Sequence, residues 1–313
     1  MRIDSIDILK GMGILLVLFG HTEIPHKIVL WIYGFHMPLF FFVSGFFSKD
    51  GGFCNSLIKN CKKILLPWLF MFLCYLCIYV GINVLYSGDL SGLLSALKGK
   101  FNLLDEDSLW YPTIWFLVCL FFVKTIDTIV WYATKCDAMR LFVGGGLYTL
   151  SQYIKLPFFL DTAMAMFLFY EIGRIFHIKG WYKKSVHYCL PFIIIALYTA
   201  FIHTILPEVD VKHNEYPLYL PLMSIPMILA FFQLSQIIEI YTPSKFRNAF
   251  SHLGRSSLVL FGLHQPLWIL LFPVASHIPL VWLRPLFMVL LTIPILLAIE
   301  KLITKYYPFL LGK

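Results

Sequence analysis

Charged residues are scarce in this sequence. Only 13% of its 313 residues are Asp, Glu, Lys or Arg, whereas 59% are hydrophobic, and the mean hydropathy is +0.79. Soluble globular domains carry about 25% charged residues, so this composition excludes an ordinary soluble domain. The apolar residues occur in blocks of roughly twenty, the length with which a helix crosses a bilayer. The predicted fold class is therefore all-α, a polytopic helical membrane protein.

The sequence also lacks the usual signals of nucleic-acid binding, metal binding and a cleavable signal peptide. The formal charge of +8 is not arranged as a basic stripe interleaved with aromatic residues, so we expect no nucleic-acid partner. Cys74 and Cys77 have C-x-x-C spacing, but they lie in an apolar run without the second pair that a metal site needs. We expect no bound metal. We also expect no cleavable signal peptide, because the first apolar run is too long and lacks a small-residue cleavage site.

The apolar blocks predict ten membrane spans in a single domain, 1–313. The spans are expected at about 6–24, 29–47, 64–86, 112–132, 141–154, 158–176, 188–206, 217–241, 257–274 and 282–304. The fifth is short and Gly-rich, so it is expected to be tilted or broken. Lys and Arg favour the cytoplasmic side of membrane proteins. With both termini in the cytoplasm, six connecting cations fall outside, namely Lys27, Lys98, Lys100, Lys155, Lys212 and Arg284. Most of the others fall inside, which favours this orientation.

Two ionisable side chains interrupt the first span. Lys10 and His21 are eleven residues apart, a spacing that returns to within about 20° of the same helix face at a separation of about 16 Å. Ionisable groups inside a membrane are costly and by default mark functional sites. Asp7 lies one turn before Lys10 and is expected to pair with it. Alternatively, Lys10 is a flanking cation that reaches the headgroups, and His21 is a buried histidine bonded to a neighbouring helix.

The second span contains another imidazole, His36. Gly34, Pro38 and Gly45 predict an irregular helix around it, and irregular backbone inside a membrane is tolerated where it is buried in protein or lines a cavity. The expected depth of His36 matches that of His21, so these two rings are expected to face one another. The alternative is that His36 only braces the kink beside Pro38.

Further charged or polar groups recur in later segments. Lys59, Lys62 and Lys63 precede the third span, where such a cluster binds either phosphate groups or anionic headgroups. Glu171 and Arg174 are three residues apart and are expected to neutralise one another on one helix face.

Two more segments carry candidate contacts. In the ninth span, His264 is again an intramembrane imidazole, and Ser256 is placed to cap the start of that helix. The acidic run 105–107 in the longest outer connection is either a contact for a ligand or only a solvated loop.

Taken together, these motifs resemble the acyltransferase-3 family of integral membrane acyltransferases, which includes sugar and polysaccharide O-acetylases. The resemblance runs from about residue 4 to 300. It is carried by Lys10 with His21, the block 35–46, Lys59 and Lys62 before Pro67, Trp115-Phe-Leu, the block 253–258, and His264 near Pro266. Lys10, Lys59 and Lys62 stand where many members carry Arg, which keeps the charge but not the guanidinium fork. The esterase-like domain fused to some members is not found in this sequence, so transfer is expected to finish within the membrane unit or with a separate partner.

The resemblance implies transfer of an acyl group, usually acetyl, from cytoplasmic acyl-CoA to a hydroxyl of a cell-envelope glycan or lipid-linked sugar, in the inner membrane of a bacterium. The expected catalytic residues are His21, Lys10 and His36, with His21 either as a general base or as a nucleophile that carries the acyl group. Lys59, Lys62, Lys63 and Arg255 are expected to hold the CoA phosphates, and the CoA arm to follow the face from Lys10 to His21. Further substrate contacts are expected from Asp7, Ser44, Trp115, Glu171 and His264.

Two rival functions are also compatible with the sequence. A transporter or flippase for a glycan or lipid also uses buried His, Glu and Arg in broken helices. Matching half-repeats would favour it, and none is evident in the sequence. A different donor, such as succinyl-CoA, is the other alternative. Membrane lipids surround the chain in either case.

Overall fold

The structure is a computed structural model that describes residues 3–87, 113–183, 188–205 and 208–313, without the side chains of 83–87. The acidic run 105–107 lies outside these residues. Within them, regular structure is helical apart from one bridge between Asp210 and Glu215.

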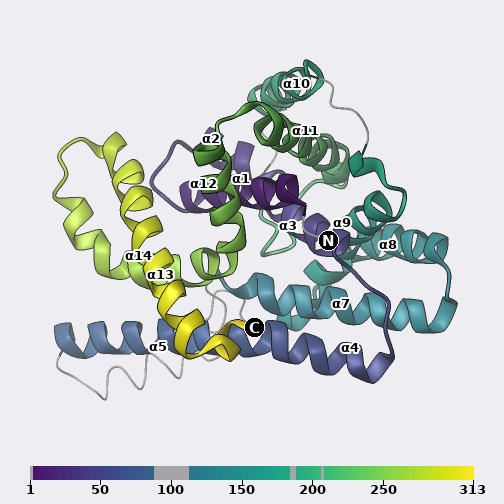
Figure 1. The fold of residues 1–313 in the computed structure, drawn as a ribbon, viewed down its shortest axis with the longest axis horizontal. Helices are drawn as coiled ribbons and strands as arrows, with labels where there is room; N and C mark the ends of the chain where they lie inside the picture. The colour runs from purple at the N-terminus through teal and green to yellow at the C-terminus, as the bar shows by residue number, and fades with distance from the viewer. Residues whose placement is uncertain (1–2, 88–112, 184–187, 206–207) are drawn as a thin grey trace.

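The α-helices follow one another along the whole described chain (Figure 1). They are α1 (Asp4–Gly20), α2 (His26–Tyr33), α3 (His36–Phe46), α4 (Phe53–Asn60), α5 (Leu66–Ser87), α7 (Trp115–Thr134), α8 (Asp137–Ser151), α9 (Leu160–Ile178), α10 (Leu190–Ile205), α11 (Leu220–Tyr241), α12 (Ser244–Arg255), α13 (Ser257–Ser276) and α14 (Arg284–Tyr306). A π-helical turn, η1 (Cys61–Leu65), joins α4 to α5. Short 3₁₀ turns are η2 (Pro157–Phe159), η3 (Trp181–Lys183), η4 (Val281–Leu283) and η5 (Pro308–Leu311).

Among the described residues, six helical segments are long and apolar enough to cross a membrane. They are His26–Phe46, Phe53–Ile82, Trp115–Thr134, Leu220–Tyr241, Ser257–Ser276 and Val281–Tyr306. The predicted all-α membrane fold is confirmed in this form. Each of the ten predicted spans overlaps a helix, but α1, α8, α9 and α10 are outside these six; α10, for example, is apolar but has only 16 residues. The count of ten spans and the orientation stay predictions.

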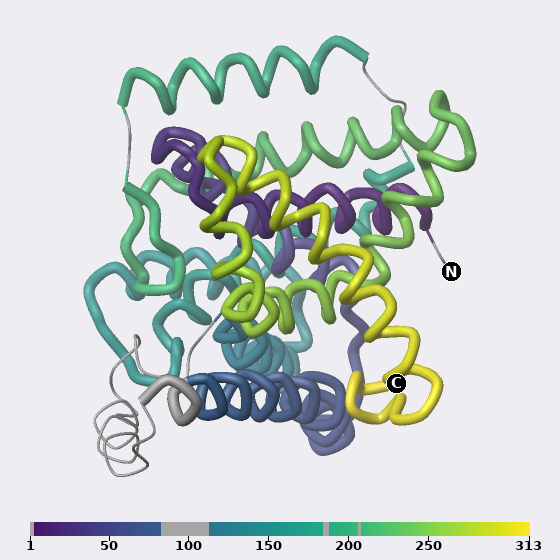
Figure 2. The backbone as a smooth tube through the Cα atoms, turned by 90° about the vertical axis from the view of Figure 1, so that its left-hand side faces the viewer, coloured from purple at the N-terminus to yellow at the C-terminus, as the bar shows by residue number. Residues whose placement is uncertain are grey.

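The first helix lies inside the bundle, where it packs against α3, α11, α12 and α13. It meets α12 through two glycines. A Cβ atom added at Gly11 would overlap the Phe250 carbonyl, and one added at Gly254 would overlap the Asp7 carbonyl. Small residues let helix backbones approach closely, so the sequence itself places the α1 backbone against α12. Figure 2 shows α10 at one edge of the molecule above α11, and α4 with α5 at the opposite edge.

The third helix is held against α9 in the same way. A Cβ atom at Gly45 would overlap the Tyr170 carbonyl, and one at Gly173 would overlap the Phe42 carbonyl. Because neither glycine has a Cβ atom, the backbones of α3 and α9 come into direct contact at both positions. Nine of the eleven residues of α3 are buried.

The second predicted span is irregular, as expected, and its break lies between α2 and α3. Helix α2 ends at Tyr33, and its C-cap is Gly34, where an added Cβ atom would meet the Tyr198 hydroxyl. Pro38 falls in the first turn of α3, where a missing backbone N–H costs little. The His36 ring nitrogen Nδ1 lies 3.0 Å from the Ile32 carbonyl, across the break.

One local prediction is wrong in part and another is wrong. The fifth span, expected to be tilted or broken, is not broken, because α8 runs without interruption through 144–146, and its tilt stays a prediction. Gly144 instead gives α8 a close approach to Leu168 of α9. Ser256 is at the N-cap of α13, but its side chain makes no capping hydrogen bond. Only this residue separates α12 from α13, and its backbone N–H continues the α12 ladder by donating to His252 at 3.0 Å.

Candidate active site

Three histidines from three predicted spans and one tyrosine form a chain of ring contacts. The His21 ring centroid lies 5.4 Å from that of His264 and 6.2 Å from that of Tyr33, and Tyr33 lies 5.0 Å from His36. We call these four residues the imidazole cluster. The end of α1, α2, the start of α3 and α13 each contribute one member, so the chain converges here from distant positions. His21 and His36 are brought near one another, since both contact the Tyr33 ring.

The His264 ring is fixed by its own helix. Its Nδ1 lies 3.0 Å from the Leu260 carbonyl and 2.8 Å from the Phe261 carbonyl. Because carbonyl oxygens only accept, Nδ1 carries the hydrogen and donates it, and Nε2 of the uncharged ring then holds a lone pair. That Nε2 atom is buried and has no hydrogen-bond partner among the described residues. A buried polar atom without a partner is costly, so it points to a functional site or a bound group.

The other two imidazoles differ in exposure. His36 is buried, and its Nδ1 donates to Ile32 across the helix break, which also leaves Nε2 as the acceptor atom. His21 is half-buried at the C-cap of α1, where its backbone N–H donates to Val17 and Leu18. His21 is therefore the more open ring, and it lies beside the buried ring of His264.

The surroundings of His264 tie the cluster to other helices. Trp268 lies 5.0 Å from the His264 ring, and its Nε1 donates to the Thr292 hydroxyl of α14 at 2.6 Å. The neighbouring Gln265 accepts a hydrogen bond from the Thr113 backbone at 3.1 Å. This bond holds the chain just before α7. Trp115, the first residue of α7, is buried, and its ring centroid lies 5.6 Å from that of Phe159. The structure thus gives Trp115 a packing role at that place.

The predicted pair of Asp7 and Lys10 is confirmed, with 2.9 Å between Oδ1 and Nζ. The face of α1 between Lys10 and His21 is covered, however. Ile14, Val17 and Leu18 lie on it, and none of the three has any exposed area. The expected path for a CoA arm along this face is therefore closed by packed side chains in this conformation.

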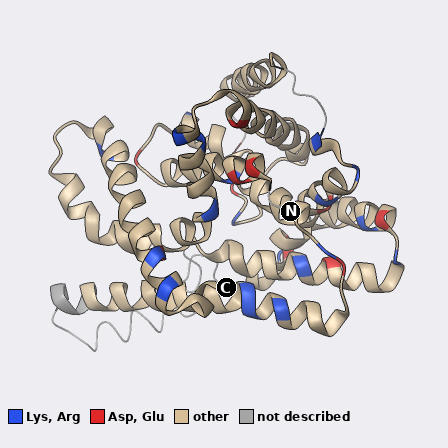
Figure 3. Ribbon diagram, viewed as in Figure 1, with Lys and Arg blue, Asp and Glu red and all other residues tan. Residues whose placement is uncertain are grey.

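The lysines before the third predicted span line two adjoining cavities. The smaller, of about 310 Å³, has four lysines in its wall, Lys49, Lys59, Lys63 and Lys124. We call it the lysine pocket. The larger, of about 610 Å³, shares Lys59 and Lys63 and adds Lys62, Lys313, Leu66 and Phe309. Figure 3 shows cationic positions gathered where α4, η1 and the end of α14 meet.

Arg255 lies apart from these two cavities. It is exposed on α12 and donates to the Ser251 hydroxyl at 3.0 Å. Neither cavity wall includes it, so the structure separates Arg255 from the lysines with which the sequence grouped it.

An ion-pair network lies behind the lysine pocket. Arg140 is 1% exposed and reaches Asp50 at 2.6 Å and Asp127 at 3.1 Å. The predicted pair of Glu171 and Arg174 is confirmed at 2.8 Å, and Arg174 also binds Asp137 at 2.8 Å. Glu171 therefore belongs to a fully buried pair and does not line the lysine pocket.

Sequence reasoning missed several residues at both places. At the lysine pocket these include Ser48, Lys49, Lys124, Asp127 and Tyr170, with Arg140 behind it, and at the imidazole cluster Tyr33. A signal did exist for two of them: Lys124 and Asp127 are three apart inside an apolar span, which is the pattern of a functional intramembrane pair. Ser44 is half-buried on α3 and lines neither the lysine pocket nor the cavity that adjoins it.

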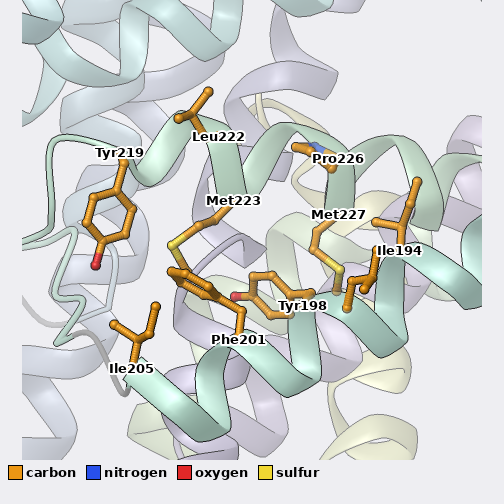
Figure 4. A pocket seen from close by; sticks show the side chains of 10 residues that line it. Ile194, Tyr198, Phe201, Ile205, Tyr219, Leu222, Met223, Pro226 and Met227 are labelled. Carbon is orange, nitrogen blue, oxygen red and sulfur yellow. The ribbon is translucent and has the colours of Figure 1, made fainter.

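A larger cavity is an apolar groove of about 710 Å³ between α10 and α11. Figure 4 shows the two helices lining it from both sides. Among the described residues in its wall, only Tyr198 and Tyr219 carry hydroxyl groups, and the Tyr198 hydroxyl already donates to the Trp31 carbonyl at 3.0 Å. The groove suits hydrocarbon and offers little acid–base chemistry. A fourth cavity, of about 360 Å³, lies beside Arg174 and His177.

Comparison with known proteins gives one match. A family model described as an acyltransferase domain matches residues 3–300, which include the whole imidazole cluster and the whole lysine pocket. No curated protein and no solved structure matches the chain.

Proposed function

The chain belongs to the acyltransferase-3 family, and from this premise we propose that it is a membrane-embedded O-acyltransferase. It moves an acyl group, usually acetyl, from cytoplasmic acyl-CoA to a hydroxyl of a cell-envelope glycan or lipid-linked sugar. The bacterial inner membrane is the proposed location. Its apolar helices support the membrane setting, and membership of an enzyme family favours transfer over transport.

The observation that carries this proposal is the contact of His21 with His264. The two ring centroids are 5.4 Å apart, and the His264 Nε2 atom is buried without a partner among the described residues. Histidine suits general-base work because its unperturbed pKa lies near neutrality. A more open imidazole beside a closed one supplies a proton acceptor and a second nitrogen to orient the reacting group.

The proposed step needs only this chain and its two substrates. His21 accepts the proton of the acceptor hydroxyl while that oxygen attacks the thioester carbonyl carbon. The carbon–sulfur bond then breaks, the CoA thiolate leaves, and the imidazolium returns the proton to sulfur. His264 and His36 orient the acceptor or the ring of His21. Lys10, fixed by Asp7, contributes a positive charge at the opposite end of α1.

Donor binding is assigned to the lysines of α4 and η1. Ammonium groups bind phosphate as point charges, and Lys59, Lys62 and Lys63 lie together in the walls of adjoining cavities. A π-helical turn at 61–65 interrupts this helix, and such turns are frequent at functional sites. Arg255 lies outside this cluster, so it has no part in the proposed donor site.

The test is acetyl transfer by purified protein in liposomes, with radiolabelled acetyl-CoA and cell-envelope glycolipid as acceptor. We expect His21→Ala to lower the rate by about a thousandfold, within the range of general acid–base catalysis. The matched control is His277→Ala, because His277 is exposed at the C-cap of α13, and it should keep the wild-type rate. Full activity of His21→Ala at equal protein level would refute the proposal.

A further inference from the structure

The lysine pocket is small and strongly positive. Four ammonium groups line a cavity of about 310 Å³. The carboxylate in its wall, Asp127, is paired with the guanidinium of Arg140 at 3.1 Å, and Arg140 is almost fully buried. Arg140 also pairs with Asp50 and Asp137, so it offsets only part of the Asp127 charge. Four lysines still face this one carboxylate in the wall of the pocket, which leaves a positive balance for a ligand. A compact group with two negative charges fits this field.

The pocket has a closed floor. Asp127 and Tyr170 are buried, and the Tyr170 hydroxyl donates to Ser48 Oγ at 2.9 Å. Lys124, from the middle of an apolar helix, lies at this floor, with Nζ 5.4 Å from the centre of the Tyr170 ring. A closed floor accepts a group at the end of a ligand. A pyrophosphate, joined to the rest of the molecule on both sides, needs an opening at each end.

The cavity that adjoins the lysine pocket is larger and partly apolar. It shares the Lys59 and Lys63 walls, is about twice as large, and is lined also by Leu66 and Phe309. Its size and apolar residues suit the flat base and ribose of a nucleotide. A phosphate on that ribose then points across the shared lysine wall into the smaller pocket.

We propose that the lysine pocket binds the phosphate monoester on the ribose of coenzyme A, with Lys124 as a direct ligand. A phosphate monoester is a near-dianion at neutral pH and carries this charge on a single phosphate. The pyrophosphate of coenzyme A spreads its two charges over two linked phosphates, so the monoester is the more compact dianion for a cavity of about 310 Å³. The inference rests on the proposed function for the identity of the donor. It adds a requirement, namely that the protein distinguishes coenzyme A from its form without this phosphate.

The experiment measures binding of two nucleotides to the purified full chain by calorimetry. Adenosine 3′,5′-bisphosphate carries the ribose phosphate, and adenosine 5′-monophosphate does not. We expect the bisphosphate to bind about tenfold more tightly, the equivalent of one charged hydrogen bond. Lys124→Met should remove most of this preference, and Lys124→Arg should keep it. Lys301→Met, at an exposed lysine of α14 outside the pocket, is the charge-matched control and should leave it unchanged.

The outcomes separate this inference from the proposed function. Equal binding of the two nucleotides to the wild type, or an undiminished preference in Lys124→Met, overturns the phosphate site even if acetyl transfer is active. A preference that disappears in Lys124→Met supports the site even if acetyl transfer fails in the liposome assay. In that case the proposed reaction is refuted and the phosphate site is supported.

Discussion

The imidazole cluster and the lysine pocket lie at the two ends of α3. His36 begins that helix, and Ser48, just beyond its end, lines the lysine pocket. At the helical rise the two residues are about 18 Å apart. Among the described residues, the His264 Nε2 atom of the cluster is buried without a hydrogen-bond partner. Behind the pocket, buried atoms of Asp127, Arg140, Glu171 and Arg174 also lack hydrogen bonds, but each of these charged groups is ion-paired.

The difference between the two ends indicates different tasks. A buried atom without a partner costs stability, and such a cost persists where reactivity is the gain. A buried charge matched by an opposite charge is costly to disturb, because removal of one partner strands the other. Substitutions in the imidazole cluster should therefore change activity more than stability, and those behind the lysine pocket the reverse.

The largest effect on stability is expected from Arg140→Met. This change leaves Asp127 and Asp50 without their buried cation, so the free energy of unfolding should fall by about 3–5 kcal/mol. Thermal unfolding in detergent measures the loss. Arg247→Met is the control, since Arg247 donates to the Glu239 carbonyl at 3.2 Å, a single hydrogen bond for which a loss of about 1 kcal/mol is expected. Equal losses in the two variants would contradict the stabilising role given to the buried ion pairs of Arg140.

His264→Phe is expected to have a smaller effect on stability than Arg140→Met and a larger effect on activity. Phenylalanine keeps a buried aromatic ring, but it removes both the Nε2 atom without a partner among the described residues and the Nδ1–H that donates to Leu260 and Phe261. Transfer activity should fall by about a hundredfold, while the unfolding temperature changes little, because the lost Nδ1 hydrogen bond offsets the removal of a buried unsatisfied atom. Activity is measured with radiolabelled acetyl-CoA and stability by thermal unfolding. Retained activity, or a marked loss of stability with it, would give His264 a structural role.

The smallest effect on stability is expected at Lys10. Its pair with Asp7 is a partly exposed i,i+3 contact, which contributes only about 0.3–0.5 kcal/mol. Lys10→Met should therefore unfold at nearly the wild-type temperature but transfer at least about tenfold more slowly, the equivalent of one charged contact. Lys10→Arg should keep most of the activity if charge is what matters. Wild-type activity in Lys10→Met would limit this lysine to positioning the end of α1.

The sequence predicts contacts within one helix well. Asp7 with Lys10, and Glu171 with Arg174, follow from a spacing of three residues on a known geometry, and both pairs are found. The apolar blocks likewise predict where helices lie, because a membrane helix must be long and apolar. These predictions need no knowledge of which helix is next to which.

Contacts between helices could not be predicted from the sequence in this way. His21 meets His264 across 243 residues of sequence, and Arg140 meets Asp50 across 90 residues. Nothing local specifies such pairs, since they depend on how α1, α8 and α13 pack. The grouping of Arg255 with the lysines had the same weakness, because it relied on the sign of the charge alone. The glycines hold the missing information, yet which backbone each of them touches is visible only in the folded chain.

The reciprocal glycine contact of α3 with α9 has one more consequence. Gly45 lies against the Tyr170 carbonyl and Gly173 against that of Phe42, so neither helix can slide past the other without the backbones colliding. The distance from His36 to Ser48 is therefore held constant. Under the proposed function, a donor whose phosphate is held at the lysine pocket has to span this distance with its own chain to bring the thioester to the histidines. We therefore expect carriers with a shorter arm to be poor donors.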